Sequence, residues 1–234
     1  MILDMIKPII LLTGYNPNAS ETGQGCFMNV VNYLSGETQV SDTVPSCYSH
    51  DHHLHTLRSL FIYANDLMVP EGHGHLLIPF IERAMGDVKK IDHSYNIHLL
   101  INFATWCSNR ANNAAKLAYE LESKFALITS IRIVSTSRAA MSAADAVSRA
   151  RSSAKDYVNS SSACRVASFA SIAASNMVFA AREINDNQFY PLLVNKLIFL
   201  FDIITPQVTE VDDVVRQRAE KFVEMGANKV LESR

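Results

Sequence analysis

The histidines are the residues whose placement most suggests chemistry. All eight lie between His50 and His98, and four of them fall within residues 50–55, close to Cys47 and Asp51. Imidazole, thiolate and carboxylate groups are ligands that Zn²⁺, Ni²⁺ and Cu²⁺ accept. This part of the chain is therefore a candidate metal-binding segment.

A usual zinc pattern joins two short motifs that are far apart in sequence. The histidines of residues 50–55 would be the first motif, and the second would come from residues 73–75 or from Cys26. The candidate metal ligands are His50, His52, His73 and His75. The alternative is a solvated polar loop whose histidines bind metal only adventitiously.

Two cysteines flank a polar loop and form the next candidate pair. Cys26 lies at the first turn of a predicted helix, where the helix dipole lowers the pKa of a thiol. As a nucleophile it would need a base, such as a histidine from the loop that contains Cys47. The alternative is that Cys26 packs beneath the loop as a small apolar residue.

Two polar pairs, Ser41–Asp42 and Asn65–Asp66, have the side chains to bind a ligand or to cap helices. The capping interpretation is favoured because Ser, Asp and Asn commonly accept hydrogen bonds from free backbone N–H groups at helix ends. The sequence contains no HExxH, GxSxG or Walker-type motif. It therefore offers no motif-based reason to propose an enzyme.

The elements that position these residues are predicted to be helices. Phe27, Val30, Val31 and Leu34 form one apolar stripe at helical spacing. A second helix is predicted over residues 54–68, after a histidine-containing loop over residues 37–53. Residues 1–22, which are rich in turn-forming residues, are expected to form an irregular lead-in.

The second half of the chain predicts long helices of unusual composition. Ala and Ser make up 26 of the 50 residues 135–184, so these helices must be stabilised by close packing against neighbours. Residues 159–163 are the expected break. Earlier in the chain, Pro79 is expected in the first turn of a helix or at a kink, and Asp92 is expected to cap the next helix.

Two further helices are predicted near the C-terminus. One covers residues 190–204, and a charged one lies within residues 208–234. No segment alternates polar and apolar residues at strand period. The predicted fold is therefore all-α, a compact multi-helix bundle with long Ala/Ser-rich helices, in a single domain over residues 1–234.

Composition limits the functional classes. The formal net charge of −2 leaves no basic excess, so nucleic acid is an unlikely partner. Four cysteines without a CxxC pair indicate reduced thiols in a cytosol. The apolar N-terminal run is interrupted by Asp4 and Lys7, and residues 192–204 are too short to span a bilayer. We expect a cytoplasmic protein with no membrane partner.

Four motifs occur together in the chain: a Cys-x-Met helix at residues 26–28, a Ser-Asp…Pro-x-Cys loop at residues 41–47, an Asn-Asp pair at residues 65–66, and the closing segment FYPLLVNKLIFLFD at residues 189–202. Their order resembles that in a family of uncharacterised bacteriophage-encoded, alanine-rich helical proteins. Asn29 and Thr43 stand where that family tends to carry Glu and His. The resemblance implies a helical fold, a phage origin and the cytoplasm of a host, and it implies no activity.

Three hypotheses for function follow. The first is a non-enzymatic protein-interaction module that modulates a host or phage protein. The second is a metal-dependent enzyme or metal-stabilised module that uses Cys26, Cys47 and residues 50–55, with zinc or another transition metal. The third is a self-associating structural protein, a homo-oligomer, because small side chains allow close helix contact between copies as readily as within one.

Overall fold

The predicted all-α fold is confirmed. The computed structural model describes residues 9–37, 41–49, 52–85, 92–123, 131–156, 159–207 and 212–232. Within this part of the chain, helices dominate, and the one sheet consists of the strands β1 (Ile10–Leu11) and β2 (Gln24–Gly25). They pair in parallel, with Ile10 opposite Gln24.

The contacts of the chain divide it into two compact units. Unit 1 consists of residues 1–91 and 201–234, and unit 2 consists of residues 92–200. Helix α9 (Phe189–Ile204) crosses the boundary. The sequence analysis expects one domain, and whether the two units fold as one stays a prediction.

Unit 1 contains short and medium-length helices. In chain order these are α2 (Ala19–Thr22), α3 (Phe27–Ser35), α4 (His53–Met68), the 3₁₀ turn η1 (Gly74–Leu77), α5 (Ile78–Met85) and α10 (Asp213–Glu232). The expectation of an irregular lead-in is wrong for β1 and α2. The reason is tertiary: the β1 backbone pairs with β2, a partner that local sequence does not reveal.

Four aromatic rings form the core of unit 1. Phe61 of α4 stacks on Phe27 of α3 and on Phe201 of α9, with ring centroids 4.3 Å apart in both pairs. Phe80 of α5 meets Phe201 edge-on at 5.6 Å. Phe27, Phe61 and Phe201 are fully buried, so this cluster joins segments that are distant in sequence and stabilises unit 1 through apolar burial.

Within unit 1, helix α10 packs against the segment before α3 through a close approach of two glycines. A Cβ added at Gly23 would lie 2.2 Å from the backbone of Gly226, so neither residue has room for a side chain. Gly23 also has φ +63°, a left-handed conformation that favours glycine. At the other end of α3, the Arg218 guanidinium donates to the Leu34 carbonyl at 3.0 Å.

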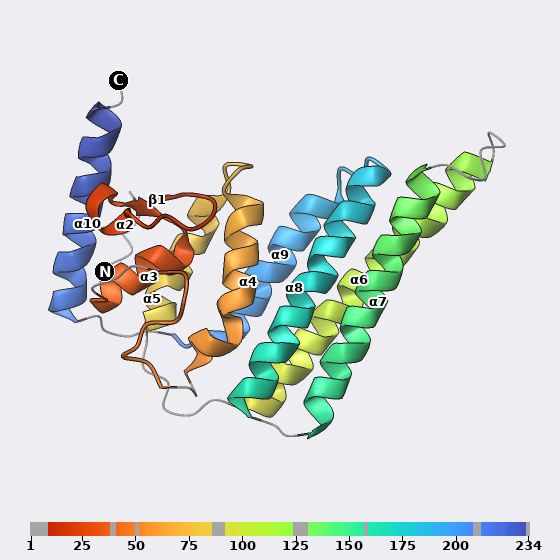
Figure 1. Ribbon diagram of the computed structural model, residues 1–234, viewed down its shortest axis with the longest axis horizontal. Coiled ribbons are helices and arrows are strands. Elements are labelled where there is room, and N and C mark those ends of the chain that lie inside the picture. The colour runs from red at the N-terminus through yellow and green to blue at the C-terminus, as the bar shows by residue number, and fades with distance from the viewer. Residues whose placement is uncertain are drawn as a thin grey trace. The chain divides into compact units, whose positions relative to one another are not determined.

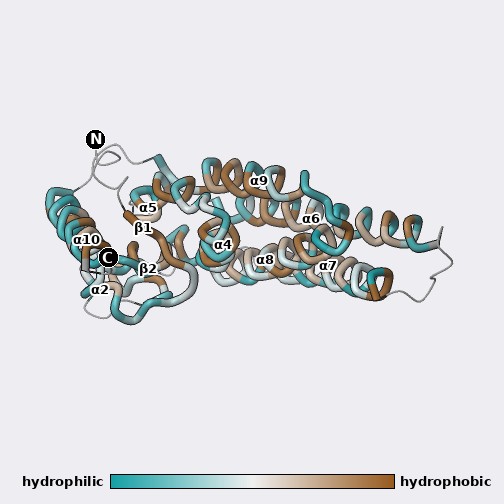
Figure 2. Tube along the Cα trace, turned by 90° about the horizontal axis from the view of Figure 1, so that it is seen from above, coloured by the Kyte–Doolittle hydropathy of each residue, from teal (hydrophilic) through white to brown (hydrophobic). Residues whose placement is uncertain are grey.

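Unit 2 is built on three long helices that lie side by side (Figure 1). They are α6 (His93–Ser123), α7 (Ile131–Asp156) and α8 (Ser160–Glu183). Their shared interior is lined largely by alanines, among them Ala118, Ala143 and Ala170, which are fully buried. Hydrophobic and hydrophilic stretches alternate along all three helices (Figure 2). The prediction of long Ala/Ser-rich helices is confirmed.

Several predicted helix boundaries are also confirmed. Pro79 is the second residue of α5, where its missing N–H removes no hydrogen bond. Asp92 precedes α6 and accepts from the Tyr95 N–H at 3.0 Å. Asn159 caps α8 by accepting from the Ser162 N–H at 2.9 Å.

One segment of α8, Ser161–Glu183, is long and apolar enough to cross a membrane by length and composition, and half of its most apolar window is buried. Core helices of water-soluble bundles meet the same criterion, so this is weak evidence for a membrane span.

Candidate functional site

The predicted metal ligands do not converge in the described part of the chain. No three His, Cys, Asp or Glu side chains among the described residues come close enough together to hold a metal ion. His50 lies outside the described residues. His73 and His75 are exposed, with ring centroids 6.2 Å apart, and His75 Nδ1 lies 3.3 Å from the Gly72 carbonyl.

His52 has a structural position instead. It is the N-cap of α4, and its Nδ1 accepts from the Leu54 N–H at 3.2 Å. Its ring lies between Tyr48 and His53, with centroids at 4.1 and 4.2 Å. A ring nitrogen committed to the helix end is not available as a ligand, so metal binding through these histidines stays a prediction that this geometry does not favour.

His53 is the most unusual histidine. It is 1% exposed, and its ring nitrogens make no hydrogen bond of good geometry among the described residues, with the backbone of Arg83 as their weak partner. Burial is the main cause that lowers its pKa to about 3, with the neighbouring His52 adding to the effect and the Arg83 backbone opposing it. His53 is therefore neutral at physiological pH, and its poorly satisfied ring nitrogens carry an energetic cost.

The two loop cysteines differ in environment. Cys26 is the N-cap of α3 and is 4% exposed, and burial raises the pKa of its thiol despite hydrogen bonds from the backbone of Asn29 and Met28. The expected lowering of this pKa by the helix dipole is wrong because desolvation is larger. Cys47 is exposed, and partial burial together with the charge of Glu37 raises its pKa. Neither thiol is activated as a nucleophile.

The Asn65–Asp66 pair of α4 holds other backbone segments in place. Asn65 Oδ1 accepts from the Phe27 N–H at 3.1 Å, and Asn65 Nδ2 donates to the Leu12 carbonyl at 2.8 Å. Asp66 Oδ1 accepts from the Gly14 N–H at 2.9 Å. Asn65 therefore caps the first turn of α3 from a different helix, which supports the capping interpretation over ligand binding.

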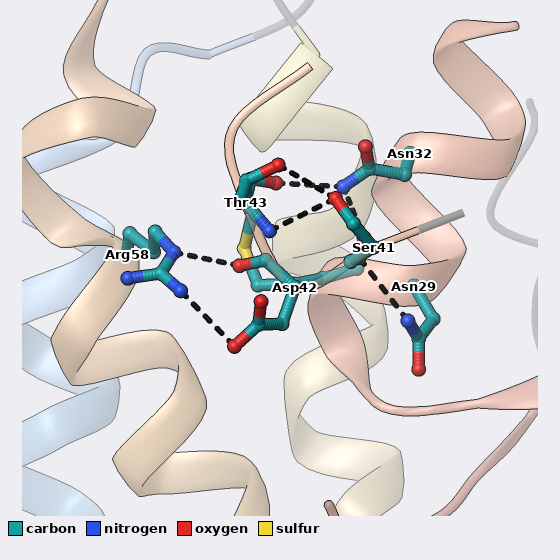
Figure 3. A network of polar contacts seen from close by, with 7 residues as sticks. Asn29, Asn32, Ser41, Asp42, Thr43 and Arg58 are labelled. Carbon is teal, nitrogen blue, oxygen red and sulfur yellow. Dashed lines mark hydrogen bonds and ion pairs between the residues drawn. The ribbon is translucent and has the colours of Figure 1, made fainter. Parts of the chain in front are cut away.

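The Ser41–Asp42 segment is held by three side chains from two helices (Figure 3). From α3, Asn29 Nδ2 donates to the Ser41 carbonyl at 3.1 Å and Asn32 Nδ2 donates to the Thr43 carbonyl at 2.7 Å. From α4, Arg58 Nε donates to the Asp42 carbonyl at 2.6 Å, and its Nη2 pairs with the Asp42 carboxylate at 3.0 Å.

Asn29 is the centre of this network, and sequence reasoning missed it. Its Oδ1 accepts from the N–H groups of Cys26 and Asn16, at 3.1 and 3.0 Å. The sequence feature that could have identified Asn29 is its position three residues after the N-cap, where a capping box places a polar side chain. Arg58 and Asn32 gave no such signal. Since these polar groups satisfy one another, we interpret the network as a structural support for the loop.

A different feature lies in unit 2, where a small hollow opens between α6, α8 and the start of α9. Its apolar lining consists of Ala114, Leu117, Met177, Ala181, Ile184 and Phe189, and its polar lining consists of Arg110, Asn113 and Asp186. Arg110 and Asp186 form an ion pair at 3.2 Å. The volume of about 50 Å³ is far below the roughly 300–1,000 Å³ of small-molecule sites, so the hollow fits a side chain better than a substrate.

Large apolar side chains are exposed along the three long helices of unit 2. Leu117, at the hollow, is 47% exposed, and Leu121 one turn later is 41% exposed. The others on these helices are Tyr95, Tyr119, Ile131, Val134, Met141, Ile172 and Phe179. Clusters of exposed apolar side chains mark interaction surfaces more often than single ones do.

No protein-family model matches this chain, and neither the curated proteins nor the solved structures give a significant match.

Proposed function

We propose that this chain is a non-enzymatic protein-interaction module that binds a host or phage protein through unit 2. The observation that carries the proposal is the hollow between α6, α8 and α9, with Leu117 and Leu121 exposed beside it. A hollow of side-chain size with apolar walls suits an apolar anchor residue of a partner helix or loop.

The lining of the hollow indicates how such an anchor would be oriented. Apolar atoms of Leu117, Met177 and Phe189 would cover an inserted side chain. The Arg110–Asp186 pair at the rim is partly exposed, with side chains 34% and 27% accessible, and it offers donors and acceptors to the partner's backbone. Rim charges of this kind contribute more to specificity and association rate than to affinity.

The resemblance to phage-encoded helical proteins supports a host or phage protein as the partner and the host cytoplasm as the place. Within unit 1, the Asn29, Asn65 and Arg58 contacts fix the loops around α3 and α4.

The test is affinity capture of partners from infected and uninfected host cells with three forms of the tagged chain. The wild type and Asn112→Glu, a charge added on an exposed position of the same helix away from the hollow, are expected to recover the same protein in stoichiometric amount. Leu117→Glu should reduce that recovery at least about tenfold, because a buried unpaired charge costs several kcal/mol. Recovery that is equal for all three forms, or that gives no reproducible protein, would contradict the proposal.

A further inference from the structure

Helix α7 has two faces, and only one of them is used inside unit 2. Thr136, Ala139, Ala143 and Ala150 are buried against the bundle, together with Ala146 and Val147. The opposite face carries Ile131, Val134, Arg138, Met141 and Asp145, which we call the α7 stripe. Each of these five residues is exposed.

The α7 stripe has the spacing of a coiled-coil seam. Its residues follow one another at intervals of three, four, three and four positions, which places them on one line of a helix. Ile131, Val134 and Met141 are 86%, 51% and 75% exposed. Three large apolar side chains on one seam are more than the scattered exposure that surface helices ordinarily show.

The positions that flank the seam carry small residues. Ser135 and Ser142 lie on one side, and Ser137 and Ala144 lie on the other. In a coiled coil these flanking positions usually hold long charged side chains that separate the helices. Small residues there let a second helix approach closely, so that the apolar residues of the seam can interdigitate.

The charges of the stripe select the partner. Arg138 lies three residues before Met141 and Asp145 lies four residues after it. In an antiparallel pair of α7 helices related by a two-fold axis beside Met141, between positions 141 and 142, each Arg138 therefore faces the partner's Asp145. A parallel pair would instead place Arg138 beside the partner's Arg138, which is repulsive.

Contacts within the chain leave the charges of Arg138 and Asp145 available to a second copy. Asp145 pairs with Arg149 at 2.8 Å, but both side chains are more than 60% exposed, and such surface pairs contribute little. Among the described residues Arg138 has no ion-pair partner. We infer that a second copy of this chain docks along the α7 stripe in an antiparallel, two-fold arrangement centred beside Met141.

The test is the oligomeric state of the full chain, measured by sedimentation equilibrium at protein concentrations from about 1 to 200 μM, a range that covers weak to moderate dimers. The wild type is expected to form a dimer. Met141→Glu places two like charges beside the axis and should weaken dimerisation at least about tenfold. Ser175→Glu, which adds the same charge on an exposed position of α8, should leave the dimer unchanged.

A charge exchange tests the antiparallel register. Arg138→Glu and Asp145→Arg should each weaken the dimer, because each creates like charges across the axis, and the double variant should recover it. Both positions are exposed, so we expect the fold to be retained, and circular dichroism checks this.

Three results would overturn the inference: a monomer at every concentration, a dimer insensitive to Met141→Glu, or two weakened single variants without recovery in the double variant. None of them bears on the hollow at Leu117, so the proposed function is tested separately.

Discussion

Asn65 shows how one buried amide can organise a unit of this chain. Two of its side-chain hydrogen bonds join α4 to the first turn of α3 and to the segment after β1. Asn65→Ala would leave the Phe27 N–H and the Leu12 carbonyl without partners, and we expect a loss of about 2–4 kcal/mol in the free energy of unfolding. Urea denaturation followed by circular dichroism measures this loss.

Asn18→Ala is the control for that experiment. Asn18 is exposed, and its side chain makes no capping hydrogen bond although it precedes α2. We expect a change within about 0.5 kcal/mol for this variant. Equal effects of the two substitutions would mean that Asn65 does not hold α3 and α4 together.

The lowered pKa of His53 implies that the free energy of unfolding depends on pH. Its folded pKa of about 3 lies below the unfolded value near 6.5, so between these values the unfolded chain binds a proton that the folded chain does not. The free energy of unfolding should therefore fall as the pH falls from about 6.5, by at most about 1.4 kcal/mol per pH unit from this residue.

His53→Leu tests that dependence because leucine fills similar space without a titrating group. Between pH 7 and pH 4 the free energy of unfolding of the wild type, measured by denaturation, should fall more steeply than that of the variant, so the difference between the two curves should grow toward low pH. Parallel curves would show that His53 gains a proton in the folded state as easily as in the unfolded one.

At the scale of elements, the packing of α10 against the backbone at Gly23 depends on Gly226. Glycine to alanine inside a helix ordinarily adds about 1 kcal/mol of stability. Here an added Cβ would lie 2.7 Å from the Gly23 carbonyl oxygen, so α10 would have to move. We expect Gly226→Ala to destabilise the chain by about 1–3 kcal/mol, measured by thermal denaturation.

Asn228→Ala is the matched substitution on an exposed position of the same helix. It should be neutral or stabilising by a few tenths of a kcal/mol, because it changes only helix propensity. If Gly226→Ala stabilised the chain as Asn228→Ala does, the close approach of α10 to Gly23 would be excluded.

The helices could be predicted from sequence because their signals are local. The stripe from Phe27 to Leu34, the proline at position 79 and the caps at Asp92 and Asn159 each act within a few residues. The β1–β2 pair and the contacts of Arg58 could not be predicted in this way, because their partners are distant in sequence.

The candidate site was less predictable than the helices. Asn65 and Asp66 were identified by type, but their role depends on backbone groups of Phe27, Leu12 and Gly14 that no spacing reveals. The cluster of histidines in sequence does not become a cluster in space among the described residues. The hollow joins Arg110 to Asp186, 76 residues apart, so it appears only once α6 and α8 are packed.

At the scale of the whole molecule, the division into two units makes a prediction about independent folding. Unit 2 is one continuous segment, residues 92–200, whereas unit 1 is interrupted by it. The alanine-lined contacts among α6, α7 and α8 lie wholly within unit 2, so its core does not require residues from unit 1. Residues 92–200 expressed alone should therefore give a helical circular dichroism spectrum and a cooperative thermal transition.

The corresponding test of unit 1 uses a shortened chain in which a flexible Gly/Ser linker joins residue 91 directly to residue 201. It keeps the stacked rings of Phe27, Phe61 and Phe201, and it should also fold if the units are independent domains. If both fragments are unfolded while the full chain melts in one transition, the single domain expected from the sequence is correct, because α9 then couples the two cores.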